Sequence, residues 1–502
     1  MIVCRHTFKH AMDLQDLLPH LQPLEHQGPR ALRLEGVTHD SRNVHPGFAF
    51  VALRGTRQDG MQFLGQALDR GATLVVAEES CPVPRGVAFV RVADARLALA
   101  RLSCALQGNP AAYLELVGIT GTNGKTTTSY LCHAMLAADG RAPGLIGTVE
   151  YRMGERLIPA SRTTPEAPEL QSMLREMVRS GGHSAAMEVS SHSLCQHRVA
   201  GIDFDVAVFT NLTQDHLDYH GTMEAYFEAK AALFRTLGTG EKKGRAVINI
   251  DDPYGRRLLG LLPANVETLT YGFDPAAQVR AEAVELSAEG TSFRLVTPWG
   301  EAAVRIPLLG RFNVYNALAA VVACGALGVP FAFLCHVLEN APPVPGRLER
   351  VACPRGGIFV DYAHTHHALE NVLQTLRELK PRRLLTVFGC GGDRDREKRP
   401  LMGTVASRLS DVTILTSDNP RREDPLAILR DVEAGFEVRG GYTVEPDREA
   451  AIAAAIAQLR EGDILLIAGK GHERMQEFAT GQTPFDDRDV ARRVVARLHR
   501  SK

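Results

Sequence analysis

A glycine-rich segment, Val117-Gly-Ile-Thr-Gly-Thr-Asn-Gly-Lys-Thr-Thr127, joins an apolar run to a helical stretch and could bind phosphate. Glycine lets backbone amides approach phosphate oxygens closely, and the N-terminus of the following helix adds partial positive charge. Lys125 could reach the β- and γ-phosphates of a nucleotide, and Thr126 could offer a hydroxyl to Mg²⁺. The general P-loop pattern requires glycine where this chain has Ile119. The segment therefore predicts nucleotide binding with an unusual spacing, and a strand-to-helix turn without nucleotide is the alternative.

Two other polar segments contain groups that a nucleotide-dependent reaction could use. Glu188, in Met187-Glu-Val-Ser-Ser-His-Ser-Leu194, offers the hard oxygen donor that Mg²⁺ prefers, although such a carboxylate can also cap a helix or lie on the surface. His216 and His220 lie four residues apart, as zinc ligands can. No HExxH glutamate and no evident third ligand accompany them, so we expect no zinc site. Lys230, in a helical segment, would ordinarily be a solvated charge.

Two arginines and a carboxylate in the last third of the chain could recognise a small charged molecule. Arg421 ends Thr416-Ser-Asp-Asn-Pro-Arg421, although Asp-Asn-Pro-Arg in isolation is a common turn. An arginine fork binds a carboxylate through two parallel hydrogen bonds, which a lysine cannot do. Arg394 supplies a second guanidinium, and Glu473, in Ala468-Gly-Lys-Gly-His-Glu473, supplies a carboxylate suited to an ammonium group.

The bulk properties limit the class of protein. A chain of 502 residues is long for one hydrophobic core, so we expect two to four domains. The net charge of -1 gives no basic field for a nucleic acid, and an anionic ligand must be bound by local groups. The chain shows neither a signal-peptide core nor a run of about 18 apolar residues, so we expect a cytoplasmic protein without a membrane span. Nine scattered cysteines without a CxxC pair indicate reduced thiols.

Apolar runs alternate with helical stretches along the whole chain, which predicts the α/β class with mainly parallel sheets covered by helices. Breaks rich in glycine, asparagine or proline, at residues 107–112 and 341–346, divide the chain into three α/β units. Open parallel sheets bind ligands beyond the carboxyl ends of their strands, where the polar segments above stand. The apolar runs are residues 48–53, 73–77, 87–92, 114–120, 184–189, 206–210, 246–250, 358–361, 384–389, 412–417 and 464–468.

The phosphate segment resembles the loop of the Mur ligases and the folylpolyglutamate synthetases, in which Thr-Gly-Thr-Asn-Gly-Lys-Thr replaces the standard spacing. The segments around Glu188 and His216 resemble the central domain of the Mur ligases, and the resemblance runs nearly end to end. It implies three α/β domains: an N-terminal UDP-binding domain (1–112), a central P-loop ATPase with a mainly parallel sheet (113–343) and a C-terminal Rossmann-like domain (344–502).

The resemblance also implies which residues bind ATP and metal. Lys125, Glu188, His216 and Lys230 would be catalytic, and Lys230 would be carbamylated, because added CO₂ turns a cation into an anion able to hold a metal. Glu188, His216 and the carbamate would hold Mg²⁺ together with Thr126. The implied ATP contacts are Gly121, Thr122, Asn123, Gly124, Lys125, Thr126, Thr127, Asn313, Asn316, Arg347 and Asp361.

The resemblance also implies two sets of residues that bind the other two substrates. A UDP-linked substrate would be bound by Ser41, Thr56, Arg57, Gln58, Thr163, Thr164, Ser190, Gln196 and Arg198. The amine would be bound by Arg394, Asp418, Asn419, Pro420, Arg421, Gly469 and Glu473. The chain departs from the commonest family form at residues 56–58, at Arg162, where many relatives have asparagine, and at His366 and His367, where Pro-Asp is usual. A solvated histidine pair is the default interpretation of the last departure, and a pH-sensing role is the alternative.

The activity implied by the resemblance is ATP-dependent amide ligation in peptidoglycan precursor synthesis. ATP would phosphorylate a carboxylate of UDP-N-acetylmuramoyl-L-alanyl-D-glutamate, and an amine would attack the acyl phosphate and release phosphate. Asp-Asn-Pro-Arg is typical of members that add meso-diaminopimelate, whose far end carries a carboxylate that lysine lacks. We expect a monomer with these small-molecule partners.

Four other activities are alternatives to this one. Arg421 disfavours a ligase that adds lysine, and the N-terminal segment disfavours a folate ligase. The joint presence of Lys125, Glu188, His216 and Lys230 disfavours a protein that only binds nucleotide, because binding alone does not require all of them. A P-loop NTPase that uses ATP for motion would leave the Asp-Asn-Pro-Arg segment without a role.

Overall fold

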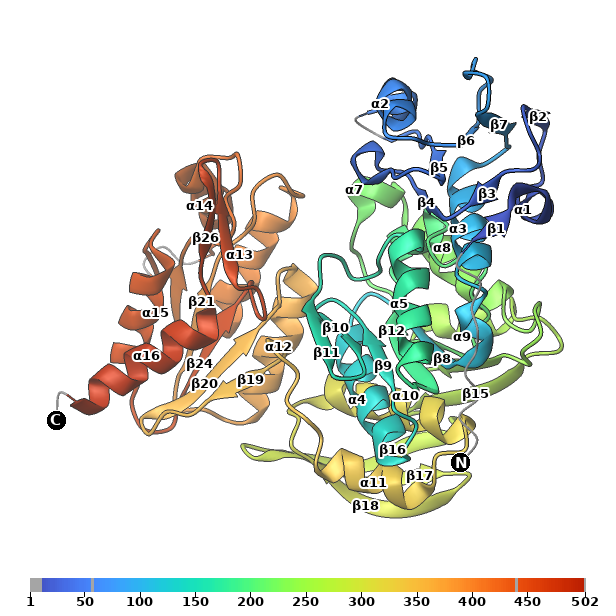
Figure 1. The fold of residues 1–502 in the computed structure, drawn as a ribbon. Coiled ribbons are helices and arrows are strands. Elements are labelled where there is room, and N and C mark those ends of the chain that lie inside the picture. Colours follow the sequence, from blue (N-terminus) through green and yellow to red (C-terminus); the bar gives the residue numbers. More distant parts are fainter. Residues whose placement is uncertain (1–10, 56–57, 438–440, 501–502) are drawn as a thin grey trace.

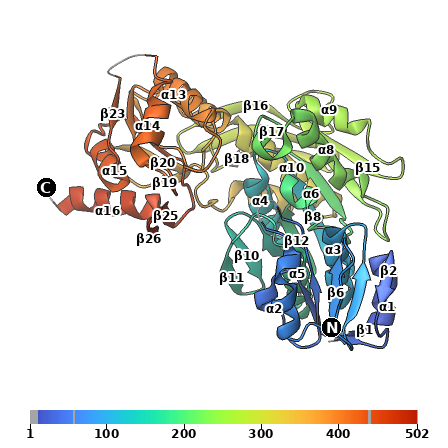
Figure 2. The same cartoon turned by 90° about the horizontal axis from the view of Figure 1, so that it is seen from above.

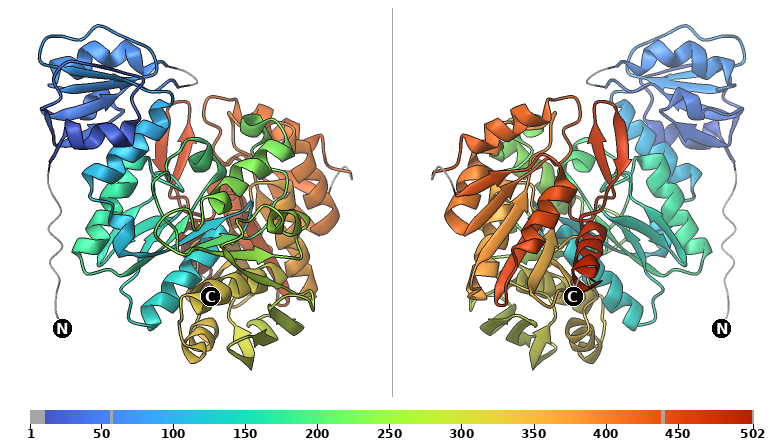
Figure 3. Two further views of the ribbon diagram at one scale, coloured as in Figure 1. Left: turned by 90° about the vertical axis from the view of Figure 1, so that its right-hand side faces the viewer. Right: turned by 90° about the vertical axis from the view of Figure 1, so that its left-hand side faces the viewer.

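The computed structural model describes residues 11–55, 58–437 and 441–500, which form three α/β domains (Figure 1). The N-terminal and C-terminal domains are attached to different sides of the central domain, and the other views agree (Figures 2 and 3). Each domain has its own sheet and hydrophobic core. The predicted α/β class with three domains and mainly parallel sheets is confirmed, while the exact boundaries at residues 112 and 343 stay predictions.

The N-terminal domain has a five-stranded sheet in the order β2-β7-β6-β5-β4, in which only the β2–β7 pair is antiparallel. The predicted break at residues 107–112 is partly helical, because a 3₁₀ turn at Pro110–Tyr113 follows closely on α3. The elements are β1 (Met12–Asp13), α1 (Leu14–Leu21), β2 (Glu25–Gln27), β3 (Arg33–Leu34), β4 (Gly36–Thr38), β5 (Phe48–Val51), α2 (Leu64–Asp69), β6 (Leu74–Ala77), β7 (Ala88–Arg91) and α3 (Ala95–Leu106).

The central domain is built on an eleven-stranded sheet in the order β11-β10-β9-β12-β8-β13-β14-β15-β16-β17-β18. The middle seven strands are parallel, and antiparallel strands extend both edges. The strands are β8 (Glu115–Thr120), β9 (Gly144–Ile146), β10 (Glu150–Met153), β11 (Arg156–Pro159), β12 (Ser184–Glu188), β13 (Val206–Phe209), β14 (Arg245–Asn249), β15 (Glu267–Gly272), β16 (Val279–Ser287), β17 (Gly290–Thr297) and β18 (Gly300–Ile306).

Helices cover both faces of this sheet, and one of them, α10, is buried for most of its length. Its sequence is apolar on every side and rich in alanine, which is the pattern of a helix enclosed by the core. It packs against α4, with Cys324 of α10 close to the backbone of Cys132. The helices are α4 (Lys125–Ala138), α5 (Ala167–Arg179), α6 (Ser191–Cys195), α7 (Leu217–His220), α8 (Met223–Arg235), α9 (Pro253–Leu259), α10 (Arg311–Ala326) and α11 (Phe331–Glu339).

The C-terminal domain has a six-stranded sheet in the order β19-β20-β24-β21-β22-β23, parallel except for the edge strand β19. Its elements are β19 (Glu349–Val351), β20 (Gly356–Asp361), α12 (His366–Glu378), β21 (Leu384–Phe388), α13 (Lys398–Leu409), β22 (Val412–Leu415), α14 (Pro425–Glu433), β23 (Tyr442–Val444), α15 (Arg448–Ala457), β24 (Asp463–Ala468), the hairpin β25 (Met475–Phe478) and β26 (Gly481–Pro484), and α16 (Asp487–Arg500).

Two sequence expectations concern the chain as a whole. Within the described ranges, none of the helices has both the length and the apolarity that crossing a bilayer requires. The eight cysteines of the described residues are free thiols, most of them buried.

A half-buried histidine, His133, is expected to make the central domain sensitive to acid. Burial, together with nearby Arg152, lowers the pKa of His133 on α4 to about 4 from an ordinary 6.5. Between these values the unfolded chain binds a proton that the folded chain does not, so stability falls as the pH falls. Each pH unit in this window corresponds to roughly 1.4 kcal/mol. We expect His133→Gln to reduce the loss of unfolding free energy between pH 6.5 and pH 4, as measured by urea denaturation; equal slopes for variant and wild type would contradict this origin.

Candidate active site

The register of three central strands brings the phosphate segment, Glu188 and the His216 loop to one edge of the sheet. Ile119 of β8 pairs with Glu188 at the end of β12, and Thr120 pairs with Phe209 at the end of β13. Because these strands are parallel, the chain leaves all three at the same edge. The phosphate loop, the β12 carboxylate and the loop that contains His216 therefore lie side by side, as the sequence predicts for a ligand site at strand ends.

The phosphate loop is fixed by hydrogen bonds from the loop after β13. The Asn123 N–H donates to Asn211 Oδ1 (3.0 Å), and Thr210 Oγ1 donates to the carbonyl oxygen of Asn123 (2.7 Å). Gly121 has φ 149° and Gly124 has φ 89°, a region that favours glycine. A Cβ at Gly121 would lie 1.8 Å from Thr210 Oγ1, so the close approach also excludes a side chain. The loop is thus preformed at the N-terminus of α4.

Lys125 lies over its own loop. Its Nζ donates to the carbonyl oxygens of Gly121 (2.9 Å) and Thr122 (2.8 Å). Burial lowers the pKa of Lys125, while the carboxylates of Glu188 and Asp215 act in the opposite direction. These neighbours place an ammonium group between the phosphate loop and two carboxylates, where the phosphates of a bound nucleotide can replace the loop carbonyls as acceptors.

Glu188 is fully buried and its carboxylate is held in one orientation. The backbone N–H of Thr148 donates to Oε1 (2.8 Å), and its hydroxyl donates to Oε2 (2.9 Å). His216 follows Asp215, whose Oδ2 lies 3.5 Å from His216 Nε2. Burial would raise the pKa of Asp215, but His216, His364 and Lys125 together hold it below its usual range. The site therefore contains two fixed carboxylates beside a histidine.

Lys230 of α8 is 1% exposed, and its Nζ donates to the carbonyl oxygen of Gly121 (2.8 Å) and lies 4.5 Å from the centre of the Tyr226 ring. Burial first, and the charge of Lys125 next, lower the pKa of Lys230 well below its ordinary value. A buried lysine with a lowered pKa has a larger share of the neutral amine, which is the form that reacts with CO₂. The environment of Lys230 therefore fits a carbamate.

The structure brings part of the predicted Mg²⁺ donor set together. Within the described part of the chain, no group of three or more His, Cys, Asp or Glu side chains is arranged to hold a metal ion. Glu188 and His216 line one cavity with Lys125 and Thr126. Mg²⁺ takes few protein ligands and keeps water and phosphate oxygens, so two side chains, a hydroxyl and a carbamate would suffice.

This cavity has a volume of about 230 Å³ and lies between the central and C-terminal domains. Arg347 crosses the gap and donates Nη2 to Thr126 Oγ1 (3.2 Å). Asn313 does not line the cavity, because its amide bonds to the Leu309 carbonyl oxygen and to Asn316 within α10. The predicted ATP contacts that line it are Thr122, Asn123, Gly124, Lys125, Thr126, Thr127, Asn316, Arg347 and Asp361.

A second cavity, of about 500 Å³, adjoins the first. The two share Asp215, His216, Tyr362, His364 and Thr365, so their contents would meet at these residues. In the C-terminal domain, β20 pairs with β24, β24 with β21 and β21 with β22, all in parallel. The loops that follow these strands therefore lie at one edge of the sheet, beside this cavity. The predicted amine contacts that line it are Arg394, Asp418, Asn419, Arg421, Gly469 and Glu473; Pro420 does not line it.

Most predicted contacts for the UDP-linked substrate form one cluster. Ser190 N–H donates to Thr164 Oγ1 (3.1 Å), and Arg198 Nη1 donates to the Thr164 carbonyl oxygen (2.9 Å). Gln196 Oε1 accepts from Arg198 Nη2 (2.6 Å), and the Thr163 hydroxyl lies 3.1 Å from that of Thr148. The cluster leads directly to Glu188, whose carbonyl oxygen accepts from Thr164 Oγ1.

The remaining UDP contacts belong to the N-terminal domain. Ser41 is buried and donates to Gln66 Oε1 (2.6 Å), and Gln58 is exposed in the following loop. Thr56 and Arg57 lie outside the described residues. Burial lowers the pKa of His39, next to this region, and the charges of Glu166 and Arg162 of the central domain also act on it, so the two domains approach one another here.

Comparison with known proteins accounts for this arrangement. Residues 33–105, 119–324 and 346–471 match the family descriptions "Mur ligase family, catalytic domain", "Mur ligase middle domain" and "Mur ligase, glutamate ligase domain". The chain belongs to the Mur ligase family. Within the family, a UDP-N-acetylmuramoyl-L-alanyl-D-glutamate–2,6-diaminopimelate ligase of Geobacter metallireducens is 49% identical over 95% of this chain and 97% of the relative.

Two further relatives extend the comparison. A UDP-N-acetylmuramyl-tripeptide synthetase of a Roseiflexus species is 43% identical over 97% of this Mur ligase and 99% of the relative. A solved structure described as a UDP-N-acetylmuramoyl-L-alanyl-D-glutamate–2,6-diaminopimelate ligase is 36% identical, with a TM-score of 0.71 over 97% of this chain and 99% of that one. The three-domain fold of this Mur ligase is therefore that of a solved relative.

Thr148 and Asp215 are among the residues that line the nucleotide cavity of this Mur ligase and that sequence reasoning missed. Thr148 follows the three-residue strand β9, which is too short to stand out as an apolar run. The available signal was the glycine before it, Gly147. The structure explains this glycine, because a Cβ there would lie 2.6 Å from Glu188 Oε1. Asp215 stands next to His216 in a segment whose histidines attract attention first, and its position beside a strand end was the available signal.

Proposed function

We propose that this Mur ligase adds meso-2,6-diaminopimelate to UDP-N-acetylmuramoyl-L-alanyl-D-glutamate with hydrolysis of ATP to ADP and phosphate. The observation that carries the proposal is the junction of the two cavities. The cavity with the phosphate loop meets, at Asp215 and His216, the cavity lined by Arg394, Arg421 and Glu473. A phosphorylated carboxylate at this junction would be within reach of an amine bound in the second cavity. The names of the full-length relatives support the same reaction.

The chain's own residues would divide the chemistry as follows. The backbone amides of the phosphate loop and Lys125 would bind the triphosphate and stabilise charge on the transferred phosphoryl group. Arg198 would bind the anionic UDP-linked substrate, with Ser190 and the Thr163–Thr164 pair beside it. Thr126, Glu188, His216 and carbamylated Lys230 would hold Mg²⁺, which offsets the repulsion between the carboxylate and the triphosphate.

The amine would be oriented by its far end. Arg421 and Arg394 would bind the distal carboxylate, and Glu473 would bind the distal ammonium. The reactive amine at the other end would then attack the acyl phosphate, and collapse of the tetrahedral intermediate would give the amide and phosphate. The adenine would lie in an adjoining cavity of about 420 Å³ lined by Phe312, Tyr315 and Asn316. The proposal is of a monomer acting in the cytoplasm, where ATP and UDP-linked precursors are present.

The first test is phosphate release by the purified protein with ATP, Mg²⁺ and UDP-N-acetylmuramoyl-L-alanyl-D-glutamate. Parallel reactions contain meso-diaminopimelate, L-lysine or no amine. L-lysine is included because the name of the Roseiflexus relative leaves the amine open. Release that requires both the dipeptide and diaminopimelate, with a tripeptide product by mass spectrometry, would support the proposal. Turnover with lysine alone, or without any amine, would refute it.

Activity is expected to depend on CO₂, because the ligand role assigned to Lys230 requires a carbamate. Dialysis under CO₂-free gas should lower activity about tenfold or more, and bicarbonate should restore it. Restoration should weaken as the pH falls below the lowered pKa of Lys230, since only the neutral amine reacts. A Lys230→Met variant should be inactive with or without bicarbonate. Wild-type activity that is indifferent to CO₂ at every pH would show that the carbamate is not used.

A further inference from the structure

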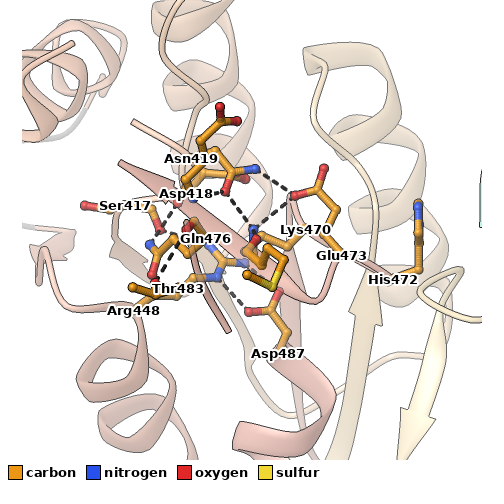
Figure 4. A network of polar contacts seen from close by, with 12 residues as sticks. Ser417, Asp418, Asn419, Arg448, Lys470, His472, Glu473, Gln476, Thr483 and Asp487 are labelled. Carbon is orange, nitrogen blue, oxygen red and sulfur yellow. Dashed lines mark hydrogen bonds and ion pairs between the residues drawn. The ribbon is translucent and has the colours of Figure 1, made fainter. Parts of the chain in front are cut away.

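Lys470 lies behind the second cavity and lines neither it nor the nucleotide cavity. It follows the end of β24, its side chain is fully buried, and its ammonium group has three acceptors (Figure 4). These are Asn419 Oδ1 (2.9 Å), Glu473 Oε2 (3.0 Å) and the carbonyl oxygen of Met475 (2.7 Å). An ammonium group has three N–H donors, so these contacts use all of its hydrogen-bonding capacity.

Two of these partners line the second cavity and are proposed contacts of the amine. Asn419 Nδ2 also donates to Glu473 Oε2 (2.7 Å), so this oxygen accepts from both Lys470 and Asn419. Both bonds go to the same oxygen, and Oε1 is left for a ligand. Lys470 thereby fixes the orientation of the Glu473 carboxylate. It also fixes the orientation of the Asn419 amide, whose oxygen faces the lysine.

The third partner connects Lys470 to the arginine that faces the same cavity. Met475 begins β25, and Glu477 lies two residues later. Glu477 Oε2 accepts from Arg421 Nε (3.0 Å), and the Glu477 carbonyl oxygen accepts from the Arg421 backbone N–H (3.0 Å). The Glu477 N–H donates to Asn419 Oδ1 (3.1 Å), the atom that also accepts from Lys470. The Lys470 ammonium group thus connects Glu473 with Arg421, the two side chains that would bind the distal ammonium and the distal carboxylate of the amine substrate.

A buried ion pair between Arg448 and Asp487 lies next to the contacts of Lys470. Arg448 and Asp487 are both fully buried and are joined by two hydrogen bonds of 2.7 Å (Figure 4). Arg448 Nη2 also donates to the carbonyl oxygen of Ala468 at the end of β24 (2.9 Å). Gln476 Nε2 donates to the Asp418 carbonyl oxygen (2.8 Å). The backbone on both sides of Lys470 is therefore fixed, and the lysine is the connection between this base and the cavity wall.

We propose that Lys470 is a positioning residue for the amine substrate: it aligns Glu473 and Asn419, and through β25 Arg421, for a ligand with an ammonium and a carboxylate at its far end. The inference rests on the proposed function and adds a residue that touches no substrate. Removing the ammonium takes one donor from a partly buried carboxylate, from the buried Asn419 amide oxygen and from the Met475 carbonyl oxygen, so the cavity wall should lose its arrangement.

The test compares Lys470→Met with Arg383→Met. Arg383 donates to Asp463 (Nη2 to Oδ2, 2.5 Å), which lies at the end of β24 that is farther from the cavity. Arg383→Met therefore also breaks a charge pair of this domain, but one distant from the cavity. For Lys470→Met we expect the KM for meso-diaminopimelate to rise roughly 10- to 100-fold, as for loss of a charged hydrogen bond. The KM values for ATP and the UDP-linked dipeptide should stay within about twofold, and Arg383→Met should change none of the three.

A second variant keeps the inference testable if methionine at 470 prevents folding. Lys470→Gln retains an N–H donor without the charge, and a smaller rise in the same KM is expected. Equal changes in all three KM values, an unchanged KM for diaminopimelate, or failure of both variants to fold would overturn the proposal. Absence of diaminopimelate turnover by the wild type would instead refute the proposed function, so the two failures are distinguishable.

Discussion

Replacing Lys125 with methionine is expected to lower kcat by roughly 10²- to 10³-fold, the usual cost of removing one group that stabilises transition-state charge. Its ammonium group lies on the carbonyl oxygens of Gly121 and Thr122, directly above the loop whose amides would bind phosphate. Methionine preserves the length of the side chain and removes the charge. Because the loop is held by Asn211 and Thr210, its conformation should survive, and the loss should appear mainly in kcat.

The measurement is tripeptide formation under saturating substrates, with ATP binding followed separately by calorimetry. Lys243→Met is the control, since this lysine is exposed in the same domain and no assigned role depends on it. A Lys125→Met protein within about threefold of wild-type kcat would mean that the phosphoryl group is stabilised elsewhere.

The sequence predicts the parallel parts of the fold well, because a strand buried on both faces is a continuous apolar run. Residues 114–120 and 464–468 are such runs, and they form β8 and β24 at the centres of their sheets. The antiparallel extension from β16 to β18 was not predicted. Its strands alternate apolar and polar residues, as in Val279–Ser287, and expose one face. Attention to apolar runs alone misses this period-two pattern.

The candidate site shows the same division. Lys125, Glu188 and Arg421 stand in contiguous motifs whose chemistry can be read locally. Lys470 stands in the motif that contains Glu473, yet its role depends on Asn419, 51 residues away in the chain, and on a hairpin that folds back over the loop. Such a contact arises from the packing of separate segments and leaves no local pattern. The resting position of Lys125 on its own loop is likewise a property of the folded site.

Replacing Arg421 with lysine is expected to lower kcat/KM for meso-diaminopimelate about 10²- to 10³-fold, the range for truncating one partner of a desolvated charge pair. Arg421 Nε and Nη1 donate to Glu477 and to the Gly392 carbonyl oxygen, which uses two of its five N–H groups. The remaining donors can form a bidentate contact with the distal carboxylate. Lysine keeps the charge but has no planar fork, and one ammonium group cannot serve both Glu477 and the substrate.

The neighbouring Arg422 provides a matched control. It is 72% exposed and paired with Asp393, so Arg422→Lys should leave kcat/KM within about twofold. L-Lysine has no distal carboxylate, so its use should be nearly unaffected by Arg421→Lys, and the preference for diaminopimelate over lysine should fall by the same factor. A parallel loss with both amines would instead mean that Arg421 maintains the shape of the site and does not read the carboxylate. The ratio of the two amines, measured by competition in one reaction, therefore separates recognition from structure.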